Sequence, residues 1–461
     1  MRFDGEMAEI RFGAGLSPLV PPPASAEAML GRLQGPDGIA QAFPVPGFDE
    51  AMAGGRTFWQ LRQERKRQEG KPGYEAADKA FKDFRRARNH ARIGWHGQRL
   101  LRHIHTRDGF RERLALFWAD HFTAQGKNGA LRVLAAPYAE TVIRPHLAGR
   151  FEDMLIAAVT SPLMLHYLDQ KDSAGPASWA AKRRKRLAGL NENLAREVLE
   201  LHTLGVDGPY SQTDVRQLAE LFTGLSFSGK DGFVFRPGMA EPGSETVLGK
   251  AYGGGNPELE QVLAALRDLA RHPATARHIA RKLAVHFTSD APEQALVDHL
   301  AAQYRAGNGD LMQVYAALLE HPAAWAPELG NVKPPYDFLA SACRALAVPE
   351  ARIARLKPGP LNGLLLAPLT PMGQRWEFAA GPDGWAEADT AWITPQALAA
   401  RLRWAMAAPR RLLRELPDPR AFAEAALGSY ANERIRFAAR AAETRSEGIG
   451  LILSSPAFQR R

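Results

Sequence analysis

The segment from residue 191 to residue 204, NENLAREVLELHTL, holds the densest set of side chains in this chain that could do chemistry. Its pattern predicts one short helix, which Gly205 would end. At 100° per residue, one face of that helix is apolar: Leu194, Ala195, Val198 and Leu201. The opposite face is polar: Glu192, Asn193, Arg196, Glu200 and Thr203. Such a helix can pack on a core with one side and offer carboxylates and an amide with the other.

Both faces of this helix indicate polar contacts. Arg196 lies four residues from Glu192 and four from Glu200, so its guanidinium can bridge the two carboxylates. Asn191 and His202 fall on the apolar side, where a polar group costs free energy unless it is hydrogen-bonded. The segment therefore has an ion-paired outer side and two inward polar groups that need partners.

His121 has the same requirement on a second predicted helix. It follows Trp118 by three residues and Leu114 by seven, which places it on the apolar side. Inward polar groups on two helices are satisfied most easily by each other. We therefore expect His121 to meet the 191–204 helix, and we expect a polar core network made of five residues: Asn191, Glu192, Arg196, His202 and His121.

The same groups could form a hydrolytic site. The catalytic candidates are His121, Asn193, Glu197, Glu200 and His202. Two imidazoles and a carboxylate could bind a divalent metal, but no HExxH motif is present, so no metal ligand is assigned and no cofactor is expected. No G-x-S-x-G motif is present, and the glycine-rich stretch at 253–255 lacks a following Lys-Ser or Lys-Thr. The competing explanation is structural, with an ion-paired helix face and hydrogen-bonded core histidines.

Positive charge is concentrated in one block of the chain. Residues 62–113 contain 16 Lys and Arg against 7 Asp and Glu, an excess of nine that equals the net charge of the whole chain. Such a block can bind phosphate, nucleic acid or an acidic partner. The anion-binding candidates in it are Arg85, Arg86, Arg88 and Arg92. The alternative is a solvated helix face, because no aromatic-interleaved RNA motif, zinc finger or helix-turn-helix pattern accompanies the block.

Composition is ordinary for a soluble globular protein of 461 residues, with 45% hydrophobic and 24% charged residues. The single cysteine, Cys343, excludes an internal disulfide framework. No apolar run approaches the roughly 20 residues that span a bilayer, and the N-terminal residues do not resemble a signal peptide. We expect a cytoplasmic protein.

Helical spacing dominates the chain and predicts a mostly α fold, a large single body of many helices with a small β-hairpin or extended excursion near 226–250. The clearest helices are predicted at Tyr74–His105, Phe110–Phe122, Leu131–Ile143 and Phe151–Val159. Further helix starts are predicted where Ser or His precedes Pro, at residues 161, 272, 321 and 455, and at a capping box formed by Ser211 and Asp214. Residues 1–55 are rich in Pro and Gly and are expected to form an irregular arm on a single domain of residues 56–461. The alternative is two domains that divide in the 170–189 loop.

Several segments, taken in order, resemble the bacterial family catalogued as domain of unknown function number 1800. They are RFGAGLSP (Arg11–Pro18), LALFWADHF (Leu114–Phe122), IRPHLAGRFEDMLIAAVTSPLMLHYLD (Ile143–Asp169), NENLAREVLELHTLGVDGPYSQTDVRQLAELFTG (Asn191–Gly224), HPATARHIARKLAVHF (His272–Phe287), GPDGWAEADTAW (Gly381–Trp392) and the terminal SSPAFQRR. The resemblance spans nearly the whole chain.

This resemblance implies a mostly helical bacterial protein whose gene often neighbours one for a second family, number 1501. The chain departs from the family pattern before Thr246–Gly249, where relatives usually have a His-Asp pair and then a Lys, and this chain has Ala240, Glu241 and Glu245. If the histidine of that His-Asp pair serves the chemistry of relatives, this chain has lost it or carries it at another position.

Three functions follow from these observations. The first is a binding or assembly protein whose partner is a neighbouring-gene product of family 1501, because no catalytic motif is complete. The second is a hydrolase-type enzyme with a His/Glu/Asn site on the 191–204 helix. The third is a polyanion or nucleic-acid binder that uses the basic 62–113 block.

Overall fold

The computed structural model describes residues 3–127, 129–183, 189–228 and 232–461. This part of the chain is mostly α-helical, as predicted, and its helices are joined by short 3₁₀ and π turns. Its only sheets are two antiparallel hairpins of two strands each. Over the same residues, no helix combines the length and the apolar character needed to cross a bilayer.

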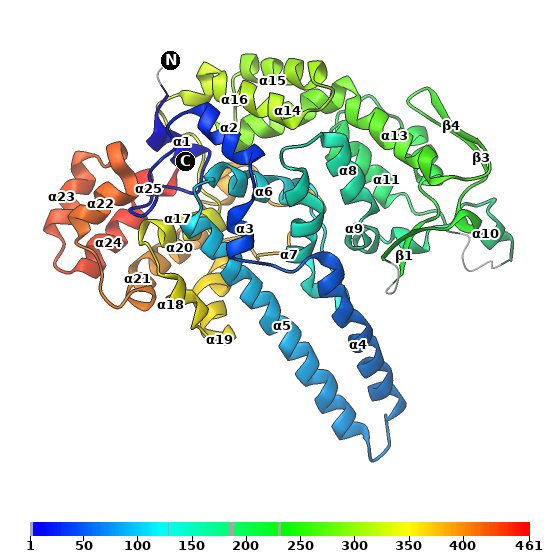
Figure 1. The fold of residues 1–461 in the computed structure, drawn as a ribbon, viewed down its shortest axis with the longest axis horizontal. Coiled ribbons are helices and arrows are strands. Elements are labelled where there is room, and N and C mark those ends of the chain that lie inside the picture. The colour runs from blue at the N-terminus through cyan, green and yellow to red at the C-terminus, as the bar shows by residue number, and fades with distance from the viewer. Residues whose placement is uncertain (1–2, 128, 184–188, 229–231) are drawn as a thin grey trace.

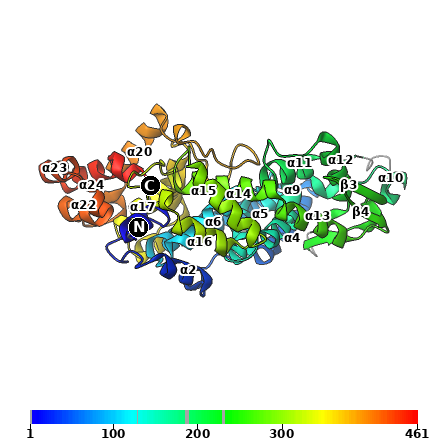
Figure 2. The same ribbon diagram turned by 90° about the horizontal axis from the view of Figure 1, so that it is seen from above.

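The helices pack around two apolar cores that lie side by side along the long axis of the molecule (Figures 1 and 2). The larger core takes its side chains from helices of the first 325 residues, and the smaller one mostly from helices after residue 335. The helices that contribute to the larger core are α1 (Gly5–Arg11), α2 (Ala26–Gln34), α6 (Gly109–His121), α7 (Ala135–Tyr138), α8 (Phe151–Thr160), α9 (Pro162–Tyr167), α11 (Asn193–Glu197), α12 (Gln212–Leu221), α13 (Leu259–Arg271), α14 (Pro273–Phe287), α15 (Gln294–Ala306) and α16 (Leu311–Glu320).

Helices of the smaller core follow residue 335. They are α17 (Pro335–Ala345), α18 (Glu350–Ala354), α19 (Pro358–Leu361), α20 (Pro395–Ala407), α21 (Pro409–Leu412), α22 (Pro419–Leu427), α23 (Glu433–Ala441), α24 (Arg445–Ser454) and α25 (Pro456–Gln459). The C-terminal half of the long helix α5 (Tyr74–His105) also enters this core through Ile93, Leu100 and Ile104. Helix α5 therefore ties the early part of the chain to the last third.

Local capping chemistry begins several of these helices. Ser161, His272 and Ser455 each accept a hydrogen bond from a backbone N–H of the first turn and are followed by proline at the first helical position. Ser211 and Asp214 form the reciprocal capping box that the sequence predicts at the start of α12. These local signals explain why most helix starts were predictable.

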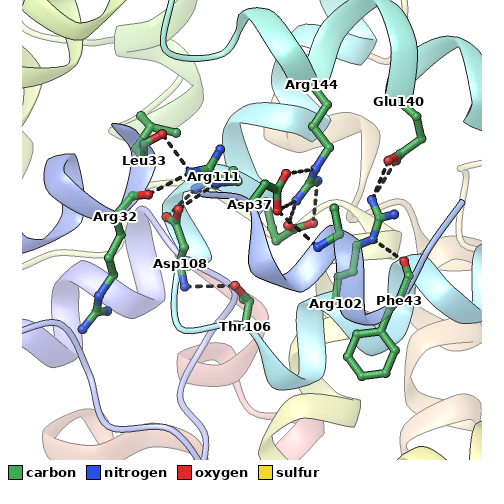
Figure 3. Close-up of polar contacts among 12 residues, drawn as sticks. Arg32, Leu33, Asp37, Phe43, Arg102, Thr106, Asp108, Arg111, Glu140 and Arg144 are labelled. Carbon is green, nitrogen blue, oxygen red and sulfur yellow. Dashed lines mark hydrogen bonds and ion pairs between the residues drawn. The ribbon is translucent and has the colours of Figure 1, made fainter. Parts of the chain in front are cut away.

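The N-terminal 55 residues contain more helix than predicted, namely α1, α2, α3 (Gly38–Ala42) and the start of α4 (Phe48–Arg67). The segment is fixed to the rest of the molecule by arginines (Figure 3). Arg144 pairs with Asp37, and Arg102 donates to the Phe43 carbonyl oxygen at 2.8 Å. At the other end of the segment, buried Arg11 donates to the Ala324 carbonyl oxygen at 2.7 Å. The boundary of the arm at residue 55 stays a prediction, but α4 runs across it.

Helices α4 and α5 pack against each other as a long hairpin that projects from the body (Figure 1). The sequence analysis missed α4, because Gly54 and Gly55 and a mostly charged surface hide its pattern. Its few apolar groups make a small separate core, in which Phe58 packs on Phe81 of α5 and on Ala130. Tertiary packing, and not intrinsic propensity, stabilises this helix.

The predicted excursion near 226–250 is two hairpins. Strand β1 (Leu225–Ser228) pairs with β2 (Gly232–Phe235), and β3 (Gly243–Val247) pairs with β4 (Lys250–Gly255). Residues 229–231 lie outside the described residues. So do residues 184–188 of the 170–189 loop, the site of the alternative domain division, and α10 (Trp179–Arg183) precedes them.

Candidate active site

The 191–204 segment forms the predicted helix, but its second half is π-helical. Helix α11 continues directly into the π turn η6 (Val198–Thr203), and Gly205 follows with a φ of +90°. The N–H of Leu204 donates to the Leu199 carbonyl oxygen at 2.9 Å, five residues back. A π turn of this kind is rare and is found mostly at functional sites.

The wider turn moves residues between faces relative to the predicted α-helical spacing. Thr203, which we expected on the polar face, is buried and donates to the Val198 carbonyl oxygen at 2.6 Å. Leu201, expected on the apolar face, is only half-buried. His202 stays inward and is fully buried. The predictions for Thr203 and Leu201 were wrong because the π turn holds one residue more than the α-helical turn that the spacing assumed.

Two histidines from other helices meet the end of η6. The Nε2 of His121 on α6 lies 3.2 Å from the His202 carbonyl oxygen, and that of His278 on α14 lies 3.0 Å from the Leu201 carbonyl oxygen. With Nε2 protonated, each ring donates to a carbonyl that the helix end leaves without an intrahelical partner. The rings of His121 and His202 are 6.0 Å apart, so the expected meeting takes place.

These imidazoles are held neutral. Burial, with Lys282 and His278 nearby, lowers the pKa of His202 to about 3. Burial also takes the pKa of His121 well below its ordinary value, and the charge of Lys282 acts in the same direction. Neutral histidines can cap carbonyls, but they do not act as acids near pH 7.

The remaining residues of the predicted network lie elsewhere on the helix. Arg196 bridges Glu192 at 3.3 Å and Glu200 at 3.1 Å, as its spacing predicts, with 38% of its side chain exposed. Asn191 donates to the Leu168 carbonyl oxygen at 2.8 Å, and Asn193 is exposed. The structure thus brings His121 and His202 together and leaves the ion-paired face on the outside.

A cavity of about 150 Å³ lies beside His121, between the two apolar cores. Phe117 and Tyr138 of the larger core form one wall, and Tyr336 of the smaller core contributes to another. Helix α14, the segment 374–392 and the C-terminal Arg461 complete the lining. The volume is enough for a small organic molecule together with water.

Asp120, the neighbour of His121, is the acid of this cavity. Burial raises its pKa to about 7, and the nearby Glu387 and Asp383 act in the same direction. The Trp385 N–H donates to Asp120 Oδ1 at 2.9 Å and opposes the shift. Gly384 makes this approach feasible, since it has a φ of +80° and a Cβ there would lie 2.6 Å from the same oxygen. Asp120 is therefore poised to exchange a proton near pH 7.

Basic groups of α14 face the same cavity. The Lys282 ammonium lies 2.7 Å from Glu387 Oε1, and both residues line the cavity. Burial, with Arg461 and Arg113 nearby, takes the pKa of His286 well below its ordinary value, so this ring is neutral. The site thus contains the Lys282 ammonium, the two neutral imidazoles of His121 and His286, and one acid with a pKa near 7.

A buried ionic cluster supports the wall formed by α17. Asp337 pairs with both Arg113 and Arg461, whose charges outweigh burial and lower the pKa of this carboxyl. Lys333 lies beside them, 4.1 Å from the centre of the Phe458 ring, and burial lowers its pKa to about 7. Removing Asp337 would leave two buried guanidinium groups without their shared carboxylate.

The part of the lining that carries Trp376 is strained at the next residue. Glu377 has a φ of 62°, in the left-handed region that a residue with a side chain rarely adopts. Its Oε2 lies 3.1 Å from the His96 ring and 3.0 Å from Arg92, both on α5. Burial opposes the charge of Glu377, but His96 and Arg92 outweigh it and hold the pKa at about 2. These contacts fix the segment that carries Trp376 and Trp385.

Six buried polar atoms of cavity-lining residues have no hydrogen-bond partner among the described residues: His121 Nδ1, His286 Nε2, Asn331 Oδ1, Tyr336 Oη, Glu377 Oε1 and Arg461 Nε. Buried polar groups are nearly always hydrogen-bonded. The lining therefore offers both donors and acceptors to a polar occupant. Within the described part of the chain, no three His, Cys, Asp or Glu residues are grouped to hold a metal ion.

Sequence reasoning found His121 in this site but missed Asp120, Lys282, His286 and Glu387. Asp120 contacts Trp385 across 265 residues of sequence, and no spacing rule links such positions. Of the other catalytic candidates, Glu197 is half-buried, and burial with Glu200 and Asp383 raises its pKa to about 7. Catalytic roles for Asn193, Glu197, Glu200 and His202 stay predictions.

A comparison with known families gives one match over nearly the whole chain. Residues 22–460 match the sequence model described as "Protein of unknown function (DUF1800)". The chain belongs to this family. No curated protein and no solved structure matches it.

About half of the residues that line the cavity lie in the segments on which the resemblance to the DUF1800 family rests. Asp120 and His121 belong to LALFWADHF, Lys282 and His286 to HPATARHIARKLAVHF, and Trp385 to GPDGWAEADTAW. These segments are far apart in sequence and meet at one site. Segments that carry the family resemblance therefore contribute side chains to one and the same cavity.

The residues at which we expected a departure from the family pattern, 240–245, lie in the hairpin region. Glu241 caps the backbone at Ala177, whose N–H donates to Oε2 at 2.9 Å. Ala240 is buried, and burial raises the pKa of Glu245 to about 7. None of the three lines the cavity.

Proposed function

We propose that this protein is a hydrolase-type enzyme that acts on a small polar substrate in the cavity. The observation that carries the proposal is Asp120, an acid with a pKa of about 7 beside the Lys282 ammonium. Perturbed titratable groups in a cavity are a common mark of active sites. The unpartnered polar atoms of His286 and Tyr336 support a polar ligand.

The proposed chemistry uses Asp120 as a general base. Its carboxylate takes a proton from a water molecule, which attacks the ester carbon or phosphorus of the substrate. The ester C–O or P–O bond breaks, and the proton passes from Asp120 to the departing alcohol. Lys282, held by Glu387, stabilises the negative charge that develops on the substrate oxygen. The rings of Trp376, Trp385 and other aromatic residues limit access of bulk water.

Hydrolysis of p-nitrophenyl acetate and p-nitrophenyl phosphate tests this proposal. We expect wild type to release p-nitrophenol, with a rate that rises with pH through an apparent pKa near 7, because the base form of Asp120 is required. Asp120→Asn should lower the rate by about 10²- to 10⁴-fold. The control is Asp298→Asn, an exposed carboxylate on α15, which should leave the rate unchanged. No release by wild type, or equal rates for the two variants, would contradict the proposal.

A second candidate is assembly with a protein partner, which the family resemblance implies to be a member of family 1501. The observation in its favour is an exposed apolar stripe on α20, formed by Leu398, Leu402 and Met406 at spacings of four residues. Co-elution of the purified neighbouring-gene product should be lost with Leu402→Asp and retained with Gln396→Asp, an exposed residue about 120° from Leu402 around the helix. Equal binding by both variants would reject this surface.

A further inference from the structure

A second depression, of about 790 Å³, lies along the α4–α5 hairpin. Its lining comes from α5 and from residues near 129–133, 362–370 and 375–378. We call it the basic groove, and its cationic residues are Lys82, Arg85, Arg86, Arg88, Arg92, Arg132 and Arg375. It contains all four of the anion-binding candidates predicted from the basic block.

The charge of the groove is not balanced by its surroundings. No Asp or Glu is among its lining residues. Within the described part of the chain, two of its seven cations form ion pairs, Lys82 with Asp78 and Arg92 with Glu377. The five guanidinium groups without a carboxylate partner repel one another, and an anion in the groove would relieve that repulsion.

Aromatic side chains hold these guanidinium groups in place. Arg92, Arg132 and Arg375 lie 5.8, 5.5 and 5.0 Å from the centre of the Phe378 ring. Trp376 stacks on Tyr336 at 4.0 Å and also has Arg99 over its ring at 5.5 Å. Rings occupied in this way orient cations and are poor platforms for stacked nucleobases. The arrangement favours phosphoryl groups over nucleic acid.

The groove adjoins the cavity. Trp376 lines both, and Arg92 in the groove pairs with Glu377 in the cavity wall. The side chains of Glu377 and of His96, which contacts it, are buried, so this contact separates the two depressions. The groove is therefore a site of its own beside the cavity.

We infer that the basic groove is a binding site for an oligoanion with phosphoryl groups. Arg88 is half-buried and donates to the Ala130 carbonyl oxygen at 2.8 Å, so it helps to shape the groove. The other four guanidinium groups without a carboxylate partner in the described part of the chain, those of Arg85, Arg86, Arg132 and Arg375, match about two phosphoryl groups, each of which carries roughly −1.5 to −2 at pH 7. Guanidinium groups bind phosphoryl oxygens in a bidentate manner.

Calorimetric titration of the intact protein with sodium tripolyphosphate tests the groove. Wild type should bind it, and the double variant Arg132→Gln/Arg375→Gln should bind at least tenfold more weakly and with a weaker dependence on salt. The control is Arg410→Gln/Arg414→Gln, which removes two exposed arginines near the smaller core and should bind as wild type does. No binding by wild type, or equal loss in both double variants, would overturn the inference.

Two further measurements distinguish a failure of this inference from a failure of the proposed function. Asp120→Asn should bind tripolyphosphate within about twofold of wild type, because the anion lies in the groove. If that variant keeps full esterase activity, the hydrolase proposal fails while loss of binding in the groove variant still establishes the anion site. Binding of a single-stranded oligonucleotide through Arg132 and Arg375, without binding of tripolyphosphate, would overturn the phosphoryl assignment.

Discussion

The cavity and the basic groove adjoin each other, yet they use charged residues in opposite ways. In the cavity, burial moves the pKa values of Asp120 and of nearby Lys333 to about 7, so charge there depends on pH. In the groove, exposed guanidinium groups such as Arg85 and Arg86 keep their charge at any ordinary pH. Burial thus makes one region sensitive to pH, whereas exposure makes the other sensitive to salt.

Asp337→Ala is expected to have the largest effect on the cavity side. It leaves Arg113 and Arg461 buried without their shared carboxylate, so the free energy of unfolding should fall by about 3–5 kcal/mol. Urea denaturation measures the change. Asp298→Ala, which breaks an exposed pair with Arg277, should cost less than about 1 kcal/mol. Similar losses of unfolding free energy for the two variants would show that the Asp337 cluster does not support the cavity wall formed by α17.

His121→Ala should have the next largest effect. It removes the donor to the buried His202 carbonyl oxygen, and stranding such a group costs about 1–3 kcal/mol. The exposed His90→Ala is the control, with no expected change in melting temperature. An unchanged melting temperature for His121→Ala, combined with lost hydrolysis, would instead assign this ring to the reaction.

Asp120→Asn should alter the pH dependence of stability. The pKa of Asp120 is raised on folding, so the protonated carboxyl stabilises the fold at low pH, and this contribution is lost as pH rises from about 4 through about 7. The variant lacks this loss, so its stability relative to wild type should rise by about 2–3 kcal/mol between pH 5 and pH 8. Thermal melts across that range measure it. Parallel pH profiles for the two proteins would place the Asp120 pKa near its ordinary value.

Arg375→Gln tests the groove side and should have the smallest effect. Relief of like-charge repulsion with Arg92 and Arg132 should add about 0.2–0.5 kcal/mol of stability at low salt, measured against the same variant at 1 M salt. Urea denaturation at the two salt concentrations gives this difference. A stability change independent of salt would mean that these arginines do not repel one another.

Local patterns made much of the fold predictable. The limits of α5 and the capping box of α12 were predicted because the residues that decide them lie within a few positions of each other. Helix α4 was missed because its partner surface belongs to α5, which its own sequence does not reveal. The predicted Leu131–Ile143 helix is instead a series of 3₁₀, α and π turns, among them α7.

The candidate site was only partly predictable for a related reason. His121 was found because an inward histidine stands out within one helix. Lys282 and Glu387 became recognisable only once the fold had brought them within 2.7 Å of each other. The excess of Lys and Arg in residues 62–113 suggested the cluster of guanidinium groups. The sequence could not show that most of these groups lack an ion pair, because that depends on which carboxylates the fold places next to them.

The π turn η6 has a consequence for how the chain tolerates changes in length. A π turn holds one residue more than the α-helical turn it replaces. Deleting a single residue between Val198 and Thr203 would therefore be absorbed by a return to α-helical geometry, and the residues that follow would keep nearly the same direction around the helix axis. A deletion in the α-helical stretch Asn193–Glu197 has no such reserve and would rotate the two sides of the helix against each other by about 100°. The capacity of this helix to lose a residue without turning His202 away from His121 is thus confined to the π turn.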